Sequence, residues 1–221
     1  MTVFAKLLHG SDPARRSRFH TAEGARPDLA AVFGLPRSAV STLWFRLTGR
    51  RPIVPWIPYN ARQALARHIC PDWQVLEIGS GMSTLWLARR CRQVDSFEAD
   101  PDWVQKIRAE LQRLGLPNVR VHYRWHWQEL CDFSAWPDES LDLLVVDGGP
   151  RPECIEAGFP KVKPGGYIYV DNTDQPRTAG RSKSVLIELA RQPGARLWTF
   201  RDFVPCNFFV NEALLYQKPS G

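Results

Sequence analysis

The stretch QVLEIGSGMSTLWLA, residues 74–88, starts as an apolar strand, turns at Gly79-Ser80-Gly81 and continues as an apolar helical segment. Glycine permits a tight turn and lets the backbone approach a ligand closely. The backbone amides at the start of the following helix attract a carboxylate or a phosphate. These features predict a ligand-binding turn at the end of the first strand of an α/β domain.

Three polar side chains flank this turn. Glu77 is acidic at a position where the strand should be buried, so it needs a cationic or hydrogen-bonded partner. Ser83 and Thr84 add hydroxyl donors at the start of the helix. A carboxylate that requires a cation, next to amides that suit an anion, fits a cofactor that carries an amino-acid group.

Downstream, apolar runs typical of strands alternate with amphipathic segments typical of helices. Asp100 is the predicted N-cap of the second helical segment, and Pro101 lies at its first position. Strands that alternate with helices in this way predict a parallel sheet with helices on both faces. The strand runs are 74–79, 94–99, 119–124, 141–147 and 166–172, and the helical segments are about 83–92, 102–115, 151–160 and 180–192.

The last two apolar runs break this alternation. Residues 196–203 and 207–218 are separated by a short turn, and two strands joined so closely must pair antiparallel. The predicted fold class is therefore α/β, with a Rossmann-like, doubly wound and mostly parallel seven-stranded sheet whose last strand is antiparallel. Ligands bind such sheets at the carboxyl ends of the strands.

Glu98 closes the second predicted strand. It follows the glycine turn at roughly the distance at which a carboxylate binds both hydroxyls of a ribose. A glycine turn on the first strand and an acid at the end of the second together indicate an adenosine-containing ligand.

Four motifs resemble those of the class I S-adenosylmethionine-dependent methyltransferases: VLEIGSGMSTLWLA, FEADP, LLVVDGG and KPGGYIYVDN. The resemblance covers about residues 55–218, and the antiparallel last strand is similar to the reversed seventh strand of that family. It implies S-adenosylmethionine as the cofactor. The residues implied are Glu77, Gly79, Ser80, Gly81, Ser83 and Thr84 for the methionine part, Glu98 for the ribose, and Trp125 and His126 for the adenine.

Asp147, Asp171 and Asn172 end two neighbouring strands at one edge, where they can converge. Two carboxylates and an amide suit Mg²⁺ or another divalent cation, which would orient and acidify a substrate hydroxyl. The pattern is similar to the metal site of catechol-type and caffeoyl-CoA-type O-methyltransferases. However, Pro150 and Arg151 stand where the catechol-type enzymes carry a lysine base.

Asp147 and Asp171 are thus the candidate catalytic residues, and a metal site would add Asn172. In the alternative without a metal, Asp147 contacts the cofactor or acts as a base, and the Asp171-Asn172 pair fixes a loop. Both interpretations stay open at the level of the sequence.

The front of the chain is basic, with eleven Lys and Arg against three Asp and Glu in residues 1–67, roughly +8. Such a segment suits nucleic acid, an anionic lipid surface or a phosphorylated substrate, unless it is a solvated face without a partner. We divide the chain into a basic N-terminal extension or helical cap, 1–50, and a methyltransferase domain, 51–221. The extension either selects substrate or forms a homodimer contact.

A proline-rich segment then leads into a helix for which Asn60 is the predicted N-cap. Trp56 and Tyr59 in this segment either line the active site or pack as a linker. The five cysteines show neither CxxC pairs nor a disulfide framework, which favours a reducing cytoplasm. The sequence contains no run of about 18 apolar residues, so no membrane span is predicted.

The predicted reaction is transfer of a methyl group to a small hydroxylated molecule by in-line displacement. The basic front keeps a nucleic-acid acceptor open, although Asp147-Gly148-Gly149-Pro150 is not the Asn/Asp-Pro-Pro-aromatic motif of amino-directed enzymes. A nicotinamide-dependent reductase would carry a third glycine where Met82-Ser83-Thr84 stands. A cofactor-binding protein without catalysis is the remaining class.

Overall fold

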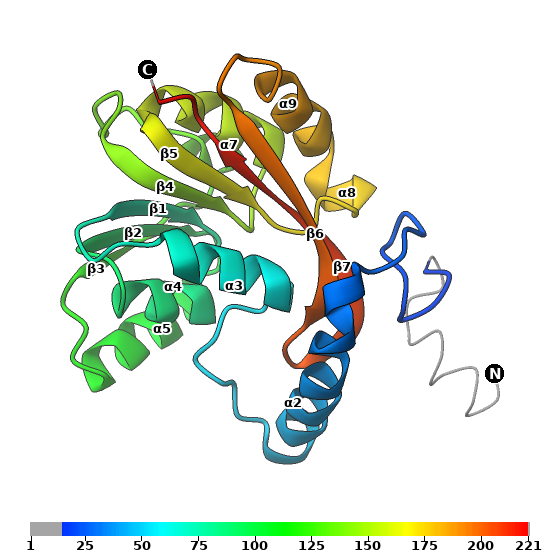
Figure 1. The fold of residues 1–221 in the computed structure, drawn as a ribbon. Helices are drawn as coiled ribbons and strands as arrows, with labels where there is room; N and C mark the ends of the chain where they lie inside the picture. Colours follow the sequence, from blue (N-terminus) through cyan, green and yellow to red (C-terminus); the bar gives the residue numbers. More distant parts are fainter. Residues whose placement is uncertain (1–14, 221) are drawn as a thin grey trace.

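The computed structural model describes residues 15–220, which form one seven-stranded sheet with the strand order β3-β2-β1-β4-β5-β7-β6 (Figure 1). Strands β1 to β5 pair in parallel, and β7 pairs antiparallel with both β5 and β6. The predicted Rossmann-like fold, with its reversed last strand, is confirmed. The strands are β1 (Gln74–Ile78), β2 (Gln93–Glu98), β3 (Val119–Tyr123), β4 (Leu141–Val146), β5 (Val162–Val170), β6 (Arg196–Val204) and β7 (Asn207–Gln217).

Helices cover both faces of the sheet (Figure 1). The α-helices are α2 (Gly34–Thr48), α3 (Tyr59–His68), α4 (Met82–Ala88), α5 (Pro101–Arg113), α6 (Trp127–Leu130), α7 (Arg151–Gly158), α8 (Pro176–Ala179) and α9 (Ser182–Leu189). Two short 3₁₀ helices are η1 (Leu29–Val32) and η2 (Phe159–Lys161). Consecutive strand residues face opposite cores, because side chains alternate along a strand. Val75 packs in the core under α3 and α4, whereas Leu76 packs in the core under α7 and α9.

The strand order reverses between β1 and β4, so the carboxyl ends of these two strands form the switch point of the sheet. Backbone bonds join the loops that leave the two strands: the amide of Asp147 donates to the carbonyl of Ile78 at 2.9 Å. The fold therefore brings the glycine turn after β1 against the loop after β4.

Two local predictions are wrong in detail. Helix α3 begins at Tyr59 with Pro58 as its N-cap, so Asn60 lies inside the first turn, and its side-chain Nδ2 donates to the Asp28 carboxylate instead. Strand β5 starts at Val162 rather than 166, because Gly165 at φ +75° keeps the chain in the sheet through a register shift opposite β4. The segment predicted as a helix at about 180–192 contains α9 (Ser182–Leu189), and the short α8 (Pro176–Ala179) precedes it, separated at Gly180 with φ +52°.

The described residues of the basic front, from residue 15 to the end of α2, lie against the end of the β6–β7 hairpin (Figure 1). The Ser38 hydroxyl of α2 donates to the carbonyl of Val204 at 2.8 Å, and the amide of Asp28 donates to the carbonyl of Arg201. Residues 1–14 of the predicted extension lie outside the described residues, and the domain division at residue 50 stays a prediction. Within residues 15–220, no helix is both long enough and apolar enough to cross a membrane. The cytoplasmic location also stays a prediction.

Candidate functional site

The glycine turn after β1 contacts the backbone that follows β4. Gly79 has φ +95°, and a Cβ on it would lie 3.1 Å from the backbone of Asp147 and Gly148. A Cβ on Gly148 would in turn lie 3.1 Å from the Cα of Gly79. Both loops therefore need glycine at the point of contact. Gly79 was predicted from the sequence and Gly148 was not, although the position of Gly148 directly after Asp147 was a usable signal.

Glu77 is fully buried in a network of hydroxyl groups. The Thr84 and Ser96 hydroxyls donate to its Oε2 at 2.5 and 2.7 Å, while its Oε1 has no hydrogen-bond partner in the described part of the chain. Burial raises the pKa of Glu77 to about 7, and the hydroxyls of Ser83, Thr84 and Ser96 limit the rise. The predicted hydrogen-bonded partners are present, and one carboxylate oxygen remains available to a cationic group.

Glu98 connects the loops after β1 and β2. Its Oε2 accepts the amide of Ser80 at 3.1 Å, and its Oε1 accepts the amides of Ala99 and Asp100 at 2.8 and 3.0 Å. The side chain is half-buried at the carboxyl end of β2, the predicted position, and its binding of a ribose stays a prediction. Its three backbone contacts fix the direction in which the carboxylate points.

Trp103 is a further residue at the turn that the sequence analysis did not single out. Its indole Nε1 donates to the carbonyl of Ser80 at 2.6 Å, and the Arg51 guanidinium lies 4.6 Å from its ring centroid. The usable signal was its place in the first turn of α5, directly behind the glycine loop. Gly81 is the N-cap of α4, and its amide donates to the Thr84 hydroxyl at 2.8 Å.

Trp125 and His126 lie on the surface beyond β3. The Trp125 side chain is 64% exposed, and the two rings meet edge to face with centroids 6.4 Å apart. This exposure excludes Trp125 from the core and leaves its ring face open to a planar ligand. Whether these side chains hold adenine stays a prediction.

Asp147 follows β4 at the switch point, with 29% of its side chain exposed. Burial raises the pKa of Asp147 to about 6; Arg151 opposes the shift and the nearby Glu98 adds to it. The Arg151 guanidinium lies 3.6 Å from Asp147 Oδ1. At neutral pH this carboxyl group is therefore mostly ionised, and its pKa is close enough to 7 for it to accept a proton during a reaction.

Asp171 and Asn172 follow β5 beside it, but their side chains have different environments. Asp171 is buried, and its Oδ1 accepts the Tyr169 hydroxyl at 2.7 Å. Burial and the neighbouring charge of Asp147 raise the pKa of Asp171 well above its usual range. Asn172 has φ +55° and shapes the turn, where its carbonyl accepts the amide of Gln175 at 3.0 Å.

The Arg151 side chain links the loops that carry these acids. It is 6% exposed; its Nε donates to the carbonyl of Asp171 and its terminal nitrogens donate to the carbonyls of Asp147 and Thr178, at 3.1 to 3.3 Å. A fixed positive charge thus stands between the ends of β4 and β5. Within residues 15–220, no group of three or more His, Cys, Asp or Glu is placed to hold a metal ion. A metal site of Asp147, Asp171 and Asn172 stays a prediction.

Four carboxyl groups lie along this edge of the sheet and influence each other. Asp147 raises the pKa of Glu77 and of Asp171, and Glu98 raises that of Asp147. Arg151 is the cation that the structure places among them. An edge with this charge suits a ligand that is itself positive, such as the sulfonium and ammonium groups of S-adenosylmethionine. The buried Oε1 of Glu77 and the glycine contact fit the same ligand.

Trp56 and Tyr59 pack between the N-terminal segment and the sheet. The Trp56 ring meets Phe45 edge to face at 5.2 Å, and the Tyr59 hydroxyl lies 3.4 Å from that of Ser41. Tyr59 is 9% exposed and borders a cavity between α2, α3 and α4. The packing interpretation accounts for both contacts, while a role in an active site stays a prediction.

The profile of the family described as "Methyltransferase domain" matches residues 76–173. This range runs from β1 to the turn after Asn172 and includes the glycine turn and all four carboxyl groups. The match therefore covers the candidate site.

Curated relatives differ in what they methylate. A protein-L-isoaspartate O-methyltransferase from Myxococcus xanthus is 32% identical over 126 residues, 56% of this chain and 55% of that protein. A 23S rRNA (uracil(1939)-C(5))-methyltransferase from Aeromonas salmonicida is 31% identical over 121 residues, 53% of this chain and 27% of that protein. The chain thus spans about half or less of the length of these relatives.

The fold is also that of a solved enzyme. The O-methyltransferase TomG from Streptomyces achromogenes, determined in complex with S-adenosylmethionine, superposes with a TM-score of 0.59. The superposition covers 86% of this chain and 96% of that chain at 17% sequence identity.

Proposed function

We propose that this chain, which has the domain and the fold of the class I S-adenosylmethionine-dependent methyltransferases, methylates a hydroxyl oxygen of a small molecule. The cofactor is S-adenosylmethionine, which supplies a methyl group on a positively charged sulfur. The relatives include enzymes that act on protein and on RNA as well as on small molecules, so the acceptor belongs to this proposal.

The observation that carries the proposal is the state of Asp147. It is a part-exposed carboxylate with a pKa of about 6, at the switch point and next to the glycine turn. A base with a pKa near the working pH removes a proton from a hydroxyl most effectively. We therefore assign Asp147 as the base that receives the acceptor proton, which makes the oxygen a better nucleophile.

The remaining residues of the site position and shield the reactants. Glu98 and the amides around Ser80 give the ribose a fixed partner, and Glu77 offers its free Oε1 to the ammonium group. Arg151 holds the backbone of both acid-bearing loops, so Asp147 keeps its direction. Methyl transfer then depends on alignment and on the exclusion of water.

We favour this base mechanism over a divalent cation. The Asp171 carboxyl is buried against Tyr169, and the Arg151 guanidinium already supplies positive charge between the two loops. A cation at Asp147, Asp171 and Asn172 would have to compete with both interactions. Activity that survives an excess of chelator agrees with the base mechanism, and activity that returns only with Mg²⁺ contradicts it.

The test is methyl transfer from labelled S-adenosylmethionine to pools of hydroxylated metabolites, followed by Asp147→Asn. We expect the turnover of the variant to fall by about a hundredfold or more, with cofactor affinity changed far less, because the amide cannot accept the proton. In the parent, kcat should rise with pH through about 6, as Asp147 loses its proton.

Asp138→Asn is the matched control, since Asp138 is an exposed acid that pairs with Lys161 and lies outside the candidate site. Its kinetics should equal those of the parent. A labelled RNA or protein product, without a labelled small molecule, would replace the proposed acceptor class while keeping the cofactor. Equal turnover in Asp147→Asn and the parent would remove the assigned base.

A further inference from the structure

Helix α2 turns its apolar side outward. The fully buried members of the helix are small or polar, namely Gly34, Ser38 and Thr42, while Leu35 and Phe45 pack partly against the protein. The large apolar residues lie on the opposite side, with exposed fractions of 69% for Val40, 60% for Leu43, 40% for Trp44 and 77% for Leu47. Their spacing places them on one helical stripe. An exposed apolar stripe of this kind on a basic segment indicates a surface that binds another molecule or a membrane.

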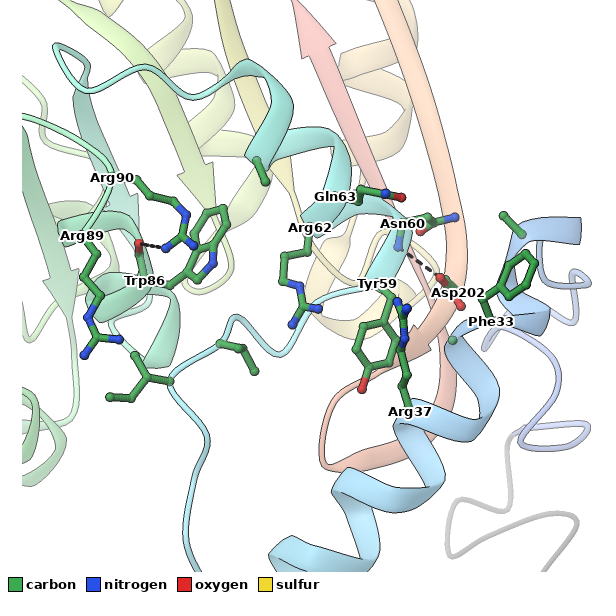
Figure 2. Close-up of a pocket in the computed structure, with 15 residues that line it drawn as sticks. Phe33, Arg37, Tyr59, Asn60, Arg62, Gln63, Trp86, Arg89, Arg90 and Asp202 are labelled. Carbon is green, nitrogen blue, oxygen red and sulfur yellow. Dashed lines mark hydrogen bonds between the residues drawn. The ribbon is translucent and has the colours of Figure 1, made fainter.

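A cavity of about 750 Å³ opens beside this helix, between α2, α3 and α4 (Figure 2). Four arginines line it: Arg37 from α2, Arg62 from α3, and Arg89 and Arg90 from the end of α4. The carboxylate in the lining is that of Asp202, which is 2% exposed and accepts the amides of Asn60 and Phe203. The arginine cavity therefore has an excess of positive charge.

Aromatic rings hold two of these guanidinium groups in place. The Arg90 guanidinium lies 4.2 Å from the centroid of Trp86 and also donates to its carbonyl, and that of Arg62 lies 5.0 Å from the centroid of Tyr59. Figure 2 shows Arg62 between the α4 arginines on one side and Arg37 on the other. Fixed guanidinium groups around one space form a site for phosphate groups, which accept several hydrogen bonds each.

Like charges also act on one another inside the cavity. Burial lowers the pKa of Arg62, and the charges of Arg37 and Arg90 lower it further. A bound anion would relieve this repulsion. The arginine cavity is thus prepared for a ligand with negative charge, and the residues that line it are not those of the cofactor site.

The apolar stripe and the arginine cavity are continuous. Arg37 lines the cavity and also borders a shallow apolar groove of about 610 Å³ that includes Val40 and Trp44. Phe33, 71% exposed, stands at the border of the cavity. A single partner that contacts both surfaces must therefore combine apolar groups with negative charge.

We infer that α2 and the arginine cavity dock on an anionic phospholipid surface, with the apolar stripe at the boundary of headgroups and acyl chains and the arginines on lipid phosphates. A second copy of the chain fits less well, because two such faces would bring two sets of arginines together. RNA would satisfy the arginines but leave the apolar stripe in water. The inference does not depend on the identity of the methyl acceptor.

The test is co-sedimentation of the full chain with vesicles of phosphatidylcholine alone or mixed with phosphatidylglycerol. We expect binding only to the mixed vesicles, and weaker binding in high salt. The double variant Leu43→Ser/Leu47→Ser and the double variant Arg62→Gln/Arg89→Gln should each reduce binding by about tenfold or more. Both pairs of side chains lie outside the candidate catalytic site, so methyl transfer serves as the check of folding.

Arg191→Gln is the matched control, because Arg191 is an exposed arginine that pairs with Glu188 on the far helix α9. It should bind vesicles as the parent does. Equal binding to both kinds of vesicle, or none, overturns the inference. A dimer in sedimentation that Leu43→Ser/Leu47→Ser dissolves, without vesicle binding, would assign the stripe to a second copy. An RNA complex that persists at physiological salt, without vesicle binding, would assign the arginines to nucleic acid.

Discussion

The burial of Glu77 makes the stability of the protein depend on pH. Its carboxyl is buried among hydroxyls, and its pKa of about 7 means that the folded protein retains a proton that the unfolded chain has already lost. The folded state therefore binds the proton more tightly. It follows that stability falls as pH rises from the ordinary carboxyl pKa through about 7.

We expect Glu77→Gln to remove this pH dependence. Between about pH 5 and about pH 8, the free energy of unfolding of the parent should fall by roughly 2 to 3 kcal/mol more than that of the variant. Urea unfolding without cofactor measures both. Parallel pH profiles would show that Glu77 does not titrate in this range.

Alanine substitutions at the two glycines of the turn should have different effects on stability. Gly79 has φ +95° and backbone within 3.1 Å of a Cβ, so Gly79→Ala should destabilise the fold by about 2 to 4 kcal/mol. Gly81 has extended backbone, and the nearest atom to a Cβ is the Ser83 hydroxyl at 3.7 Å. Gly81→Ala should therefore change stability by less than about 1 kcal/mol.

Calorimetry with S-adenosylhomocysteine separates the roles of these glycines. If the cofactor approaches the backbone at Gly81, the alanine variant should remain folded and lose about tenfold or more in affinity. Unchanged affinity would move the cofactor away from this turn.

At the scale of elements, the start of α5 is the part of the site most completely determined by local sequence. The Asp100 side chain accepts the amides of Asp102 and Trp103 at 2.9 and 3.1 Å, and Pro101 follows it, as predicted. The same turn carries the Trp103 indole onto the carbonyl of Ser80. The cap thus supports the wall of the candidate cofactor site.

Asp100→Ala should cost about 1 kcal/mol of stability, because two amides lose their acceptor. Asp102→Ala is the control: it removes an acid from the same turn without removing a cap, and should cost no more than about 0.5 kcal/mol. Thermal unfolding of both variants gives the comparison. Equal losses would mean that the charge of the turn matters rather than the cap.

Most strands could be predicted within about one residue, since apolar runs bounded by turn residues are local signals. Strand β5 began earlier than predicted, because Pro164 and Gly165 indicate a turn locally while the neighbouring β4 keeps them in the sheet. Helix α2 carried no motif. Its apolar spacing is visible in the sequence, but the direction of that face depends on the β6–β7 hairpin against which the helix packs.

At the scale of the whole molecule, the sequence placed the candidate acids at one edge but could not give their environments. Asp171 points to Tyr169 because residues two apart share a face of a strand, which the pattern alone could have indicated. The role of Arg151 could not be predicted, since its three carbonyl partners lie in the loop after β4, in the loop after β5 and in helix α8. Burial and long-range pairing decide such details, and both require the assembled fold.

A cluster around Glu212 joins distant parts of the chain behind the candidate site. The Glu212 carboxylate on β7 is fully buried and pairs with Lys183 at 2.8 Å and Arg201 at 2.7 Å. It also accepts the Thr173 hydroxyl at 3.1 Å, while Lys183 reaches Glu23 in the N-terminal segment. The loop that carries Asp171 is therefore fastened to β7, α9 and the front of the chain together.

Glu212→Gln should destabilise the protein by about 2 to 3 kcal/mol. This loss is smaller than that from breaking a fully buried ion pair, because Lys183 and Arg201 can turn partly toward water. Burial alone would raise the pKa of Glu212, but the two cations outweigh it and lower the pKa. Its contribution is therefore present above the ordinary carboxyl pKa and lost as pH falls below about 4. The difference in the free energy of unfolding between parent and variant should therefore shrink as pH falls.

Urea unfolding at several pH values measures this difference. The control is Glu188→Gln, which changes an exposed acid paired with Arg191 and should change stability by less than about 0.5 kcal/mol. Equal losses in the two variants would show that the Glu212 cluster adds nothing beyond a surface ion pair.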